Sequence, residues 1–253
     1  MPWPVFKPFQ GFACHGAFCG PGRRWRWCWG LAACAAPPIP YDRQGAGGVQ
    51  TIGVLTPYMS EQATVFVWGS PGRMFGLVGA LAEAAAQSAR EGRVKGALDS
   101  RQFQARPVFE EALGAALTTQ GYRVVPVTVA RSGRDFLDRY SGLPEGPEAW
   151  LDCFFVDWGY FAATGGDDTP YRPYLNVTCR LVRAKDGAVL MRDRVIYNWF
   201  FNRDPPMSVV TLPPDPQFSF RTSDDLVAEP DRAVAGLVAA LRAAAGAVGT
   251  VLK

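Results

Sequence analysis

Histidine is nearly absent from this 253-residue sequence, which contains one, His15. Ser-His-Asp and Cys-His catalysis and His-ligated zinc all need an imidazole to move a proton or to bind the metal. His15 lies upstream of a segment typical of an export signal, so a processed chain would keep no histidine. Cys14 and Cys19 beside it lack the second ligand pair of a zinc site. These three chemistries are therefore excluded. Since the sequence carries no other residue-level catalytic motif, we expect a protein that is not an enzyme and that has no metal or other cofactor.

An excess of positive charge is missing as well. The chain has 26 Lys and Arg against 23 Asp and Glu. Four basic residues and no acidic residue precede Cys34, which leaves 22 against 23 after it, a net charge of −1. Nucleic-acid binding calls for a clustered positive excess. We expect no nucleic-acid partner.

Long apolar runs are also missing. No uninterrupted apolar stretch approaches the roughly 18 residues that would span a bilayer. The segment 70–98 carries small residues every four positions (Gly72, Gly76, Ala80 and Ala84), but its longest uncharged part, Met74–Ala82, has nine residues. Such a stripe predicts a tightly packed helix, with docking on a membrane surface as the alternative.

A short stretch near the N-terminus reads RRWRWCWGLAACAAPP, from Arg23 to Pro38. Its arginines are followed by seven apolar or small residues, Trp27–Ala33, which is the order of a secretory leader. The Pro-rich residues after Cys34 are typical of a tether. We predict a leader at 1–33, a tether at 34–48 and a single domain at 49–253.

The four residues Leu31-Ala32-Ala33-Cys34 resemble the lipobox of bacterial lipoproteins. The resemblance implies that the Cys34 thiol receives a fatty-acyl chain such as palmitate and that the chain is cut just before it. Ala35, rather than an acidic residue, follows the cysteine, which by resemblance favours the outer membrane. Two alternatives stay open: a cleaved leader without lipid, and a buried apolar strand that contains a free Cys34.

The folded part alternates between strand and helix patterns. They predict an α+β fold, with a mixed sheet that ends in a three-stranded antiparallel meander and helices packed on a face. Strands are predicted at 49–59, 63–68, 122–129, 151–161, 174–183 and 188–200, and helices at 70–98, 103–120 and from Pro230 onward, with an irregular crossing at 204–225.

The register of the meander follows from its turn. A three-residue loop with Gly187 in the left-handed conformation pairs Leu181 with Met191, Val177 with Val195 and Leu175 with Tyr197. The preceding hairpin, centred on Gly166, places Cys153 opposite Cys179. An exported protein meets an oxidising compartment, so we expect a disulfide there, with two buried free cysteines as the alternative.

Aromatic and acidic residues on these strands are the candidate site residues. Trp158 and Tyr160 share one strand face, and Tyr197 and Trp199 share another, so an accessible row could bind a glycan, a lipid or a peptide. Packing in the core is the alternative for the same residues. Asp157 is expected to be buried and paired with Arg180, Arg192 or Arg194. Asp167 and Asp168 suggest a cation site or a solvated turn.

The lipobox followed by this element order resembles uncharacterised envelope lipoproteins of proteobacteria, over 49–253. The resemblance implies a non-enzymatic scaffold, assembly factor or regulator on the periplasmic side of the envelope, with the membrane and an envelope protein as partners. The first alternative is a ligand-binding lipoprotein that uses the aromatic strands. The second is an enzyme of unknown type.

Overall fold

The computed structural model describes residues 37–69, 76–164, 169–200 and 209–253. These residues belong to one compact unit, Pro37–Lys253. The predictions for Cys34, for the small residue Gly72 and for the Asp167–Asp168 pair fall outside the described residues.

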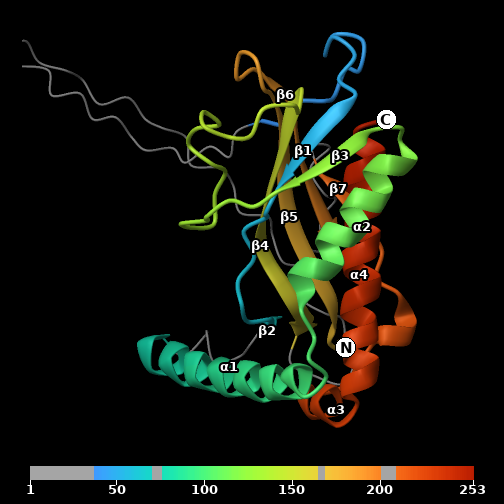
Figure 1. Cartoon of the computed structure of the whole chain (residues 1–253). Coiled ribbons are helices and arrows are strands. Elements are labelled where there is room, and N and C mark those ends of the chain that lie inside the picture. The colour runs from blue at the N-terminus through green and yellow to red at the C-terminus, as the bar shows by residue number, and fades with distance from the viewer. Residues whose placement is uncertain (1–36, 70–75, 165–168, 201–208) are drawn as a thin grey trace, which may run out of the picture. The chain divides into compact units, whose positions relative to one another are not determined.

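Within the described residues, seven strands form one mixed sheet (Figure 1). Their order across the sheet is β3-β1-β4-β5-β6-β7, and β2 pairs in parallel with the far end of β4. The α+β prediction is confirmed. The strands are β1 (Thr51–Leu55), β2 (Thr64–Gly69), β3 (Arg123–Val127), β4 (Ala149–Thr164), β5 (Arg172–Arg183), β6 (Val189–Tyr197) and β7 (Val210–Leu212).

The meander of β4, β5 and β6 has the predicted register. Gly187 has a φ of 73°, the left-handed conformation required by the turn. All three predicted pairs, Leu181 with Met191, Val177 with Val195 and Leu175 with Tyr197, lie opposite each other. The turn and the alternation of apolar residues therefore determine which side chains of β5 and β6 enter the core.

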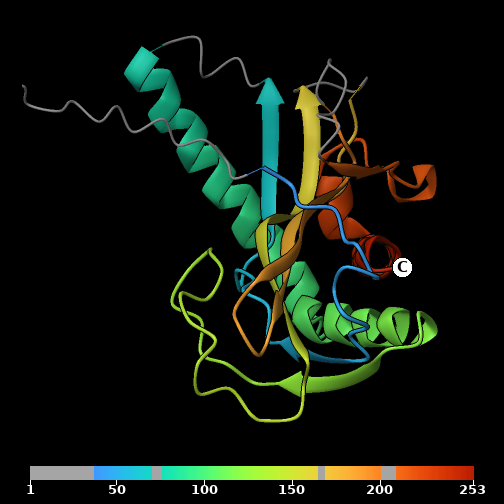
Figure 2. The ribbon, with the colours of Figure 1, turned by 90° about the horizontal axis from the view of Figure 1, so that it is seen from above.

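Two long helices cover one face of the sheet (Figure 2). They are α2 (Ala105–Thr119) and α4 (Pro230–Val251). The Phe109 ring of α2 meets the Phe155 ring of β4 edge-on at 4.8 Å, and the Tyr160 hydroxyl donates to the Ala233 carbonyl at 2.6 Å. By length and composition alone, α4 is apolar enough to cross a membrane. Its nine buried residues are instead covered by the domain, as in a core helix.

The remaining helices lie at one end of the sheet. Helix α1 (Gly76–Asp99) runs beside β2, and the short α3 (Ser223–Ala228) follows the single-turn 3-10 helix η2 (Pro216–Phe218). Thr222 and Asp225 form a reciprocal capping box that starts α3. The segment 204–225, predicted to be irregular, therefore contains β7 and the start of α3, and that prediction is wrong there.

A β-bulge in β4 changes which of its side chains face the helices. The register shifts between Phe155 and Asp157, so the buried positions change from odd to even numbers along the strand. Trp158 and Tyr160 thereby enter the core. Asp157 turns to the other face, where 39% of its side chain is exposed and Arg134 Nη1 lies 3.7 Å away. The prediction that Asp157 is buried and paired with Arg180, Arg192 or Arg194 is wrong.

The chain joins the sheet soon after the predicted tether begins. Ile39 forms an antiparallel bridge with Arg192 of β6, with its N–H 2.8 Å from the Arg192 carbonyl. Ala46 and Val49 are buried. The segment 37–48 therefore packs on the domain, and the stretch that separates Cys34 from the fold is shorter than expected.

Candidate functional site

Three of the four aromatic residues predicted to bind a ligand lie in the core. Trp158, Tyr160 and Tyr197 are at most 4% exposed. The indole N–H of Trp158 donates to the Ser60 carbonyl at 2.9 Å, and the Tyr197 hydroxyl accepts from the Asp215 N–H at 2.9 Å. These rings already have partners within the domain. The expectation that they form an accessible row is wrong.

Trp199 does not continue the face of Tyr197. Asn198 between them has a φ of 68°, and its N–H donates to the Leu212 carbonyl at 2.8 Å. This left-handed residue ends β6 and turns the chain. Trp199 lies just beyond the strand and is partly buried, so the alternation assumed from sequence ends before it reaches this residue.

Cys153 and Cys179 form a disulfide between β4 and β5. They face each other in the ladder, as the hairpin prediction required, with Cα atoms 4.1 Å apart. Both are buried on the face that packs against the helices. They are the only cysteines among the described residues.

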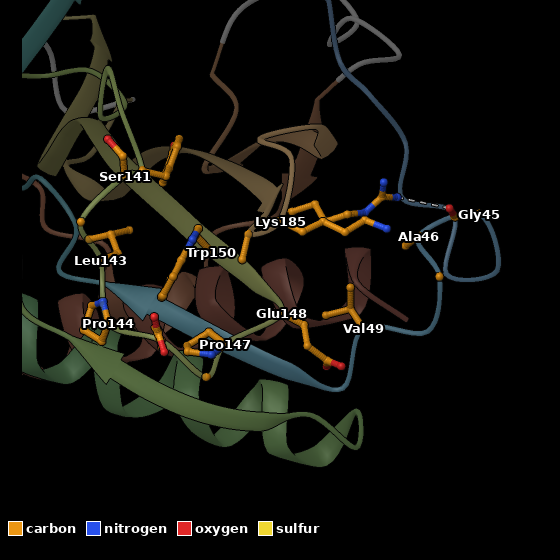
Figure 3. Close-up of a pocket in the computed structure, with 17 residues that line it drawn as sticks. Gly45, Ala46, Val49, Ser141, Leu143, Pro144, Pro147, Glu148, Trp150 and Lys185 are labelled. Carbon is orange, nitrogen blue, oxygen red and sulfur yellow. Dashed lines mark hydrogen bonds between the residues drawn. The ribbon is translucent and has the colours of Figure 1, made fainter.

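A concave pocket opens where three segments meet at one end of the sheet (Figure 3). Its volume is about 750 Å³, which lies within the range of small-molecule sites. The lining residues come from the chain before β1, from the loop before β4 and the start of that strand, and from the end of β5 and the β5–β6 turn. Figure 3 shows Trp150 at the centre, with Leu143, Pro144 and Pro147 on one side and Ala46 and Val49 on the other.

The floor of the pocket depends on a glycine. Trp150 is 4% exposed and packs with Leu55 and Val127. A Cβ at Gly53 of β1 would come within 2.3 Å of the Trp150 ring. The absence of a side chain at Gly53 therefore lets the indole lie close against β1.

Charged residues stand at the rim. The Glu148 carboxylate accepts from the N–H groups of Gln50 at 2.7 Å and Thr51 at 2.8 Å, and these bonds lower its pKa. Arg183 donates to Asp186 at 3.1 Å and to the Gly45 carbonyl at 3.5 Å. Lys185 is exposed at the same rim. The pocket thus combines an apolar floor with charged groups of both signs at its edge, Glu145 and Glu148 as well as Arg183 and Lys185.

A buried carboxylate holds the segment 128–148 over the open face of the sheet. Asp152 is fully buried and accepts from Arg131 at 2.5 Å, from the Tyr140 hydroxyl at 2.6 Å and from the Leu137 N–H at 2.9 Å. Arg180 lies 3.9 Å from the carboxylate and donates to both the Tyr140 hydroxyl and the Leu137 carbonyl. Burial raises the pKa of Tyr140. This cluster positions one wall of the pocket.

Sequence reasoning missed Asp152 although its signal was present. The strand LDCFFVDWGYF contains two acidic residues in an apolar context, Asp152 and Asp157. The bulge between them puts both on the open face of the sheet, where the segment 128–148 buries Asp152 and leaves 39% of the Asp157 side chain exposed. Nothing in the sequence around Arg131 or Tyr140 identifies them as the partners, because both lie in irregular chain.

Comparisons with known proteins give little guidance. No family model matches the chain, and no curated protein matches it. Among solved structures, a PelC dodecamer from Paraburkholderia phytofirmans is 14% identical over 57% of this chain, with a TM-score of 0.24. The match covers 65% of that chain, less than two thirds. A likeness this distant supports no argument about function.

Proposed function

We propose that this chain is a non-enzymatic lipoprotein, anchored in the bacterial envelope through Cys34, that serves as a scaffold, assembly factor or regulator. The observation that carries the proposal is where the fold begins. The compact unit starts at Pro37, three residues after the predicted lipidation site. Three extended residues reach about 11 Å at most. An acyl chain on Cys34 would therefore hold the domain close to the bilayer surface.

The disulfide supports export of the domain. Cys153 and Cys179 are bridged in the core, and disulfides persist in oxidising compartments such as the periplasm. A leader at 1–33 would send the chain there. Lipidation of Cys34 would leave the processed protein without a free thiol.

Metabolic labelling with a fatty-acid analogue tests the anchor. We expect the protein to be labelled and Cys34→Ala to abolish the label, whereas Cys28→Ala, a change at a cysteine of the leader, keeps it. Labelling that survives Cys34→Ala would contradict the proposal. Fractionation of the membranes then tests the outer-membrane prediction, and co-purification from detergent-solubilised envelopes tests for a protein partner.

A second candidate function is ligand binding by the lipoprotein, and the pocket around Trp150 favours it. The apolar floor and the rim, which carries charges of both signs, would suit a small molecule or peptide with an apolar body and polar groups. Native mass spectrometry of the protein extracted from envelopes would detect a bound molecule. Gly53→Ala displaces the Trp150 ring and should remove that molecule, while the exposed Gly92→Ala, away from the pocket, should retain it.

A further inference from the structure

Helix α1 turns several polar side chains toward the domain. Glu91 accepts from the N–H of Val65 in β2 at 3.3 Å and from the Gln87 side chain at 2.9 Å. Arg90 and Glu83 form an ion pair at 2.7 Å, and both side chains are more than four-fifths buried. A surface helix normally turns its apolar side to the core. In the first half of α1 this arrangement is reversed, whereas the second half buries Val94 and Leu98 in the ordinary way.

The outward side of α1 is apolar over its first half. Leu77, Val78 and Leu81 are 77%, 79% and 64% exposed. Figures 1 and 2 show this half of α1 projecting away from the sheet, with no described element over its outer side. Exposed apolar patches of this kind mark interaction surfaces. We call the exposed set the outer stripe; its members are Leu77, Val78, Leu81, Ala85, Ser88, Ala89 and Gly92.

We propose that the outer stripe is covered by the outer stripe of a second copy of this chain, in an antiparallel, two-fold pairing of the α1 helices. The large residues of the stripe lie in the first half of α1 and the small ones in the second half. An axis near Ala85 sets Leu81 opposite Ser88 and Ala89 of the other copy, and Leu77 opposite Gly92. Each large side chain then meets a small one, which is the complementarity that a two-fold interface needs.

Charge favours a protein over a lipid surface as the occupant. The outer stripe contains no charged residue, and Glu83 turns inward to Arg90, so two copies bring no like charges together. Helices that lie on anionic membranes carry Lys and Arg along their polar face. Residues 76–89 of α1 contain neither, and the exposed Arg93 and Lys95 of its second half are each paired with an aspartate, Asp224 and Asp99.

The size of the outer stripe determines how strong the pairing of two copies should be. The three large side chains offer about 300 Å² of apolar surface, and a 24-residue helix is about 36 Å long. Stable dimers bury about 800 Å² on each partner. The pairing is therefore weak in dilute solution and forms when the copies are concentrated in one membrane. In this respect the inference rests on the proposed anchor at Cys34.

Cysteine crosslinking in intact membranes tests the pairing. In Ala85→Cys the new thiol lies near the axis and is free to meet its counterpart, because Cys153 and Cys179 are bridged and Cys34 would be acylated. Mild oxidation should give a disulfide-linked dimer. Ala115→Cys, at an exposed position on α2, should stay monomeric. Adding Leu81→Glu to Ala85→Cys should reduce the dimer at least tenfold, since it places a charge in the apolar contact; tenfold corresponds to about 1.4 kcal/mol.

The outcomes separate this inference from the proposed anchor. Fatty-acid labelling of the same samples reports on Cys34 independently of the crosslink. Labelled protein with no Ala85→Cys dimer would overturn the second-copy proposal and leave the lipoprotein intact. Crosslinking of Ala85→Cys to a different envelope protein would also overturn it. A third result would overturn it as well: the Cys34→Ala chain floats with vesicles of bacterial lipid, and Leu81→Glu abolishes that flotation, so that the outer stripe binds lipid. Unchanged thermal melting of each variant confirms that it is folded.

Discussion

Removal of the Asp152 carboxylate should destabilise the domain strongly at neutral pH. The Arg131 side chain is 7% exposed, and it also donates to the Thr56 carbonyl at 2.7 Å. In Asp152→Ala the guanidinium stays buried with no carboxylate. Removing one partner of a buried ion pair lowers the free energy of unfolding by about 3–5 kcal/mol. Since a domain is stable by about 5–15 kcal/mol, this is a large part of the total.

Urea unfolding of wild type, Asp152→Ala and Asp152→Asn measures the cost. Asn keeps an acceptor for the Leu137 N–H and should lose less than Ala. Hydrogen exchange at the Leu137 amide should rise in both variants, because that N–H loses its charged acceptor. Replacing both partners, in Asp152→Leu with Arg131→Met, should restore part of the loss. A loss under about 1 kcal/mol in Asp152→Ala would refute the reasoning. So would a double variant whose loss equals the sum of the losses in Asp152→Leu and in Arg131→Met alone.

Three further predictions concern other parts of the domain. Thiol titration of the denatured, unreduced protein that begins at Cys34 should find Cys153 and Cys179 unreactive, and two free thiols would disprove the disulfide. The bridge joins residues 26 positions apart, which stabilises the fold by about 3.5 kcal/mol in the chain-entropy model. The pKa of Glu148 is lowered from its ordinary value of 4.5, so its carboxylate stabilises the start of β1 at pH values above 4.5, and this stability is lost as the pH falls through the lowered pKa. The stability of Glu148→Gln should therefore depend less on pH below 4.5 than that of wild type. Equal pH profiles of unfolding for the two proteins would count against the contact. Trp158→Ala should cost about 3–5 kcal/mol as a core truncation; a fluorescence change of Trp158 on adding envelope glycans or lipids would show instead that the ring is accessible.

The sequence was sufficient for those parts of the fold where local chemistry determines geometry. Gly187 needed the left-handed conformation, and the alternation along β5 allowed one register with a buried face. The pairing of Cys153 with Cys179 followed from the same logic. Each of these predictions depended on a turn and a period of two.

Predictions failed where a single residue broke that period. The bulge after Phe155 placed Trp158 and Tyr160 in the core and turned Asp157 to the other face, where it is partly buried. The left-handed Asn198 ended the face that contains Tyr197. A bulge leaves no fixed mark in sequence, and Asn is accepted in many turns. The Asp152 cluster was missed because three of its partners come from irregular chain 12 to 21 residues away, which periodicity does not describe.

Helix α1 shows a different limit. Its composition predicted a helix and a stripe of small residues, and the helix is present over Gly76–Asp99. Which side faces the domain depends on Glu91 reaching the edge of β2, and that contact spans 26 residues of sequence. A helical period gives the faces of a helix but does not say which one is covered.

The central claim is that the folded unit is held at a membrane through a lipid on Cys34. The most direct measurement is the intact mass of the protein extracted with detergent from the membranes of its natural host. We predict a chain that begins at Cys34, carries the added mass of acyl chains and is lighter by the two hydrogens lost in the Cys153–Cys179 disulfide. A chain that begins at Met1 without acyl mass would contradict the claim.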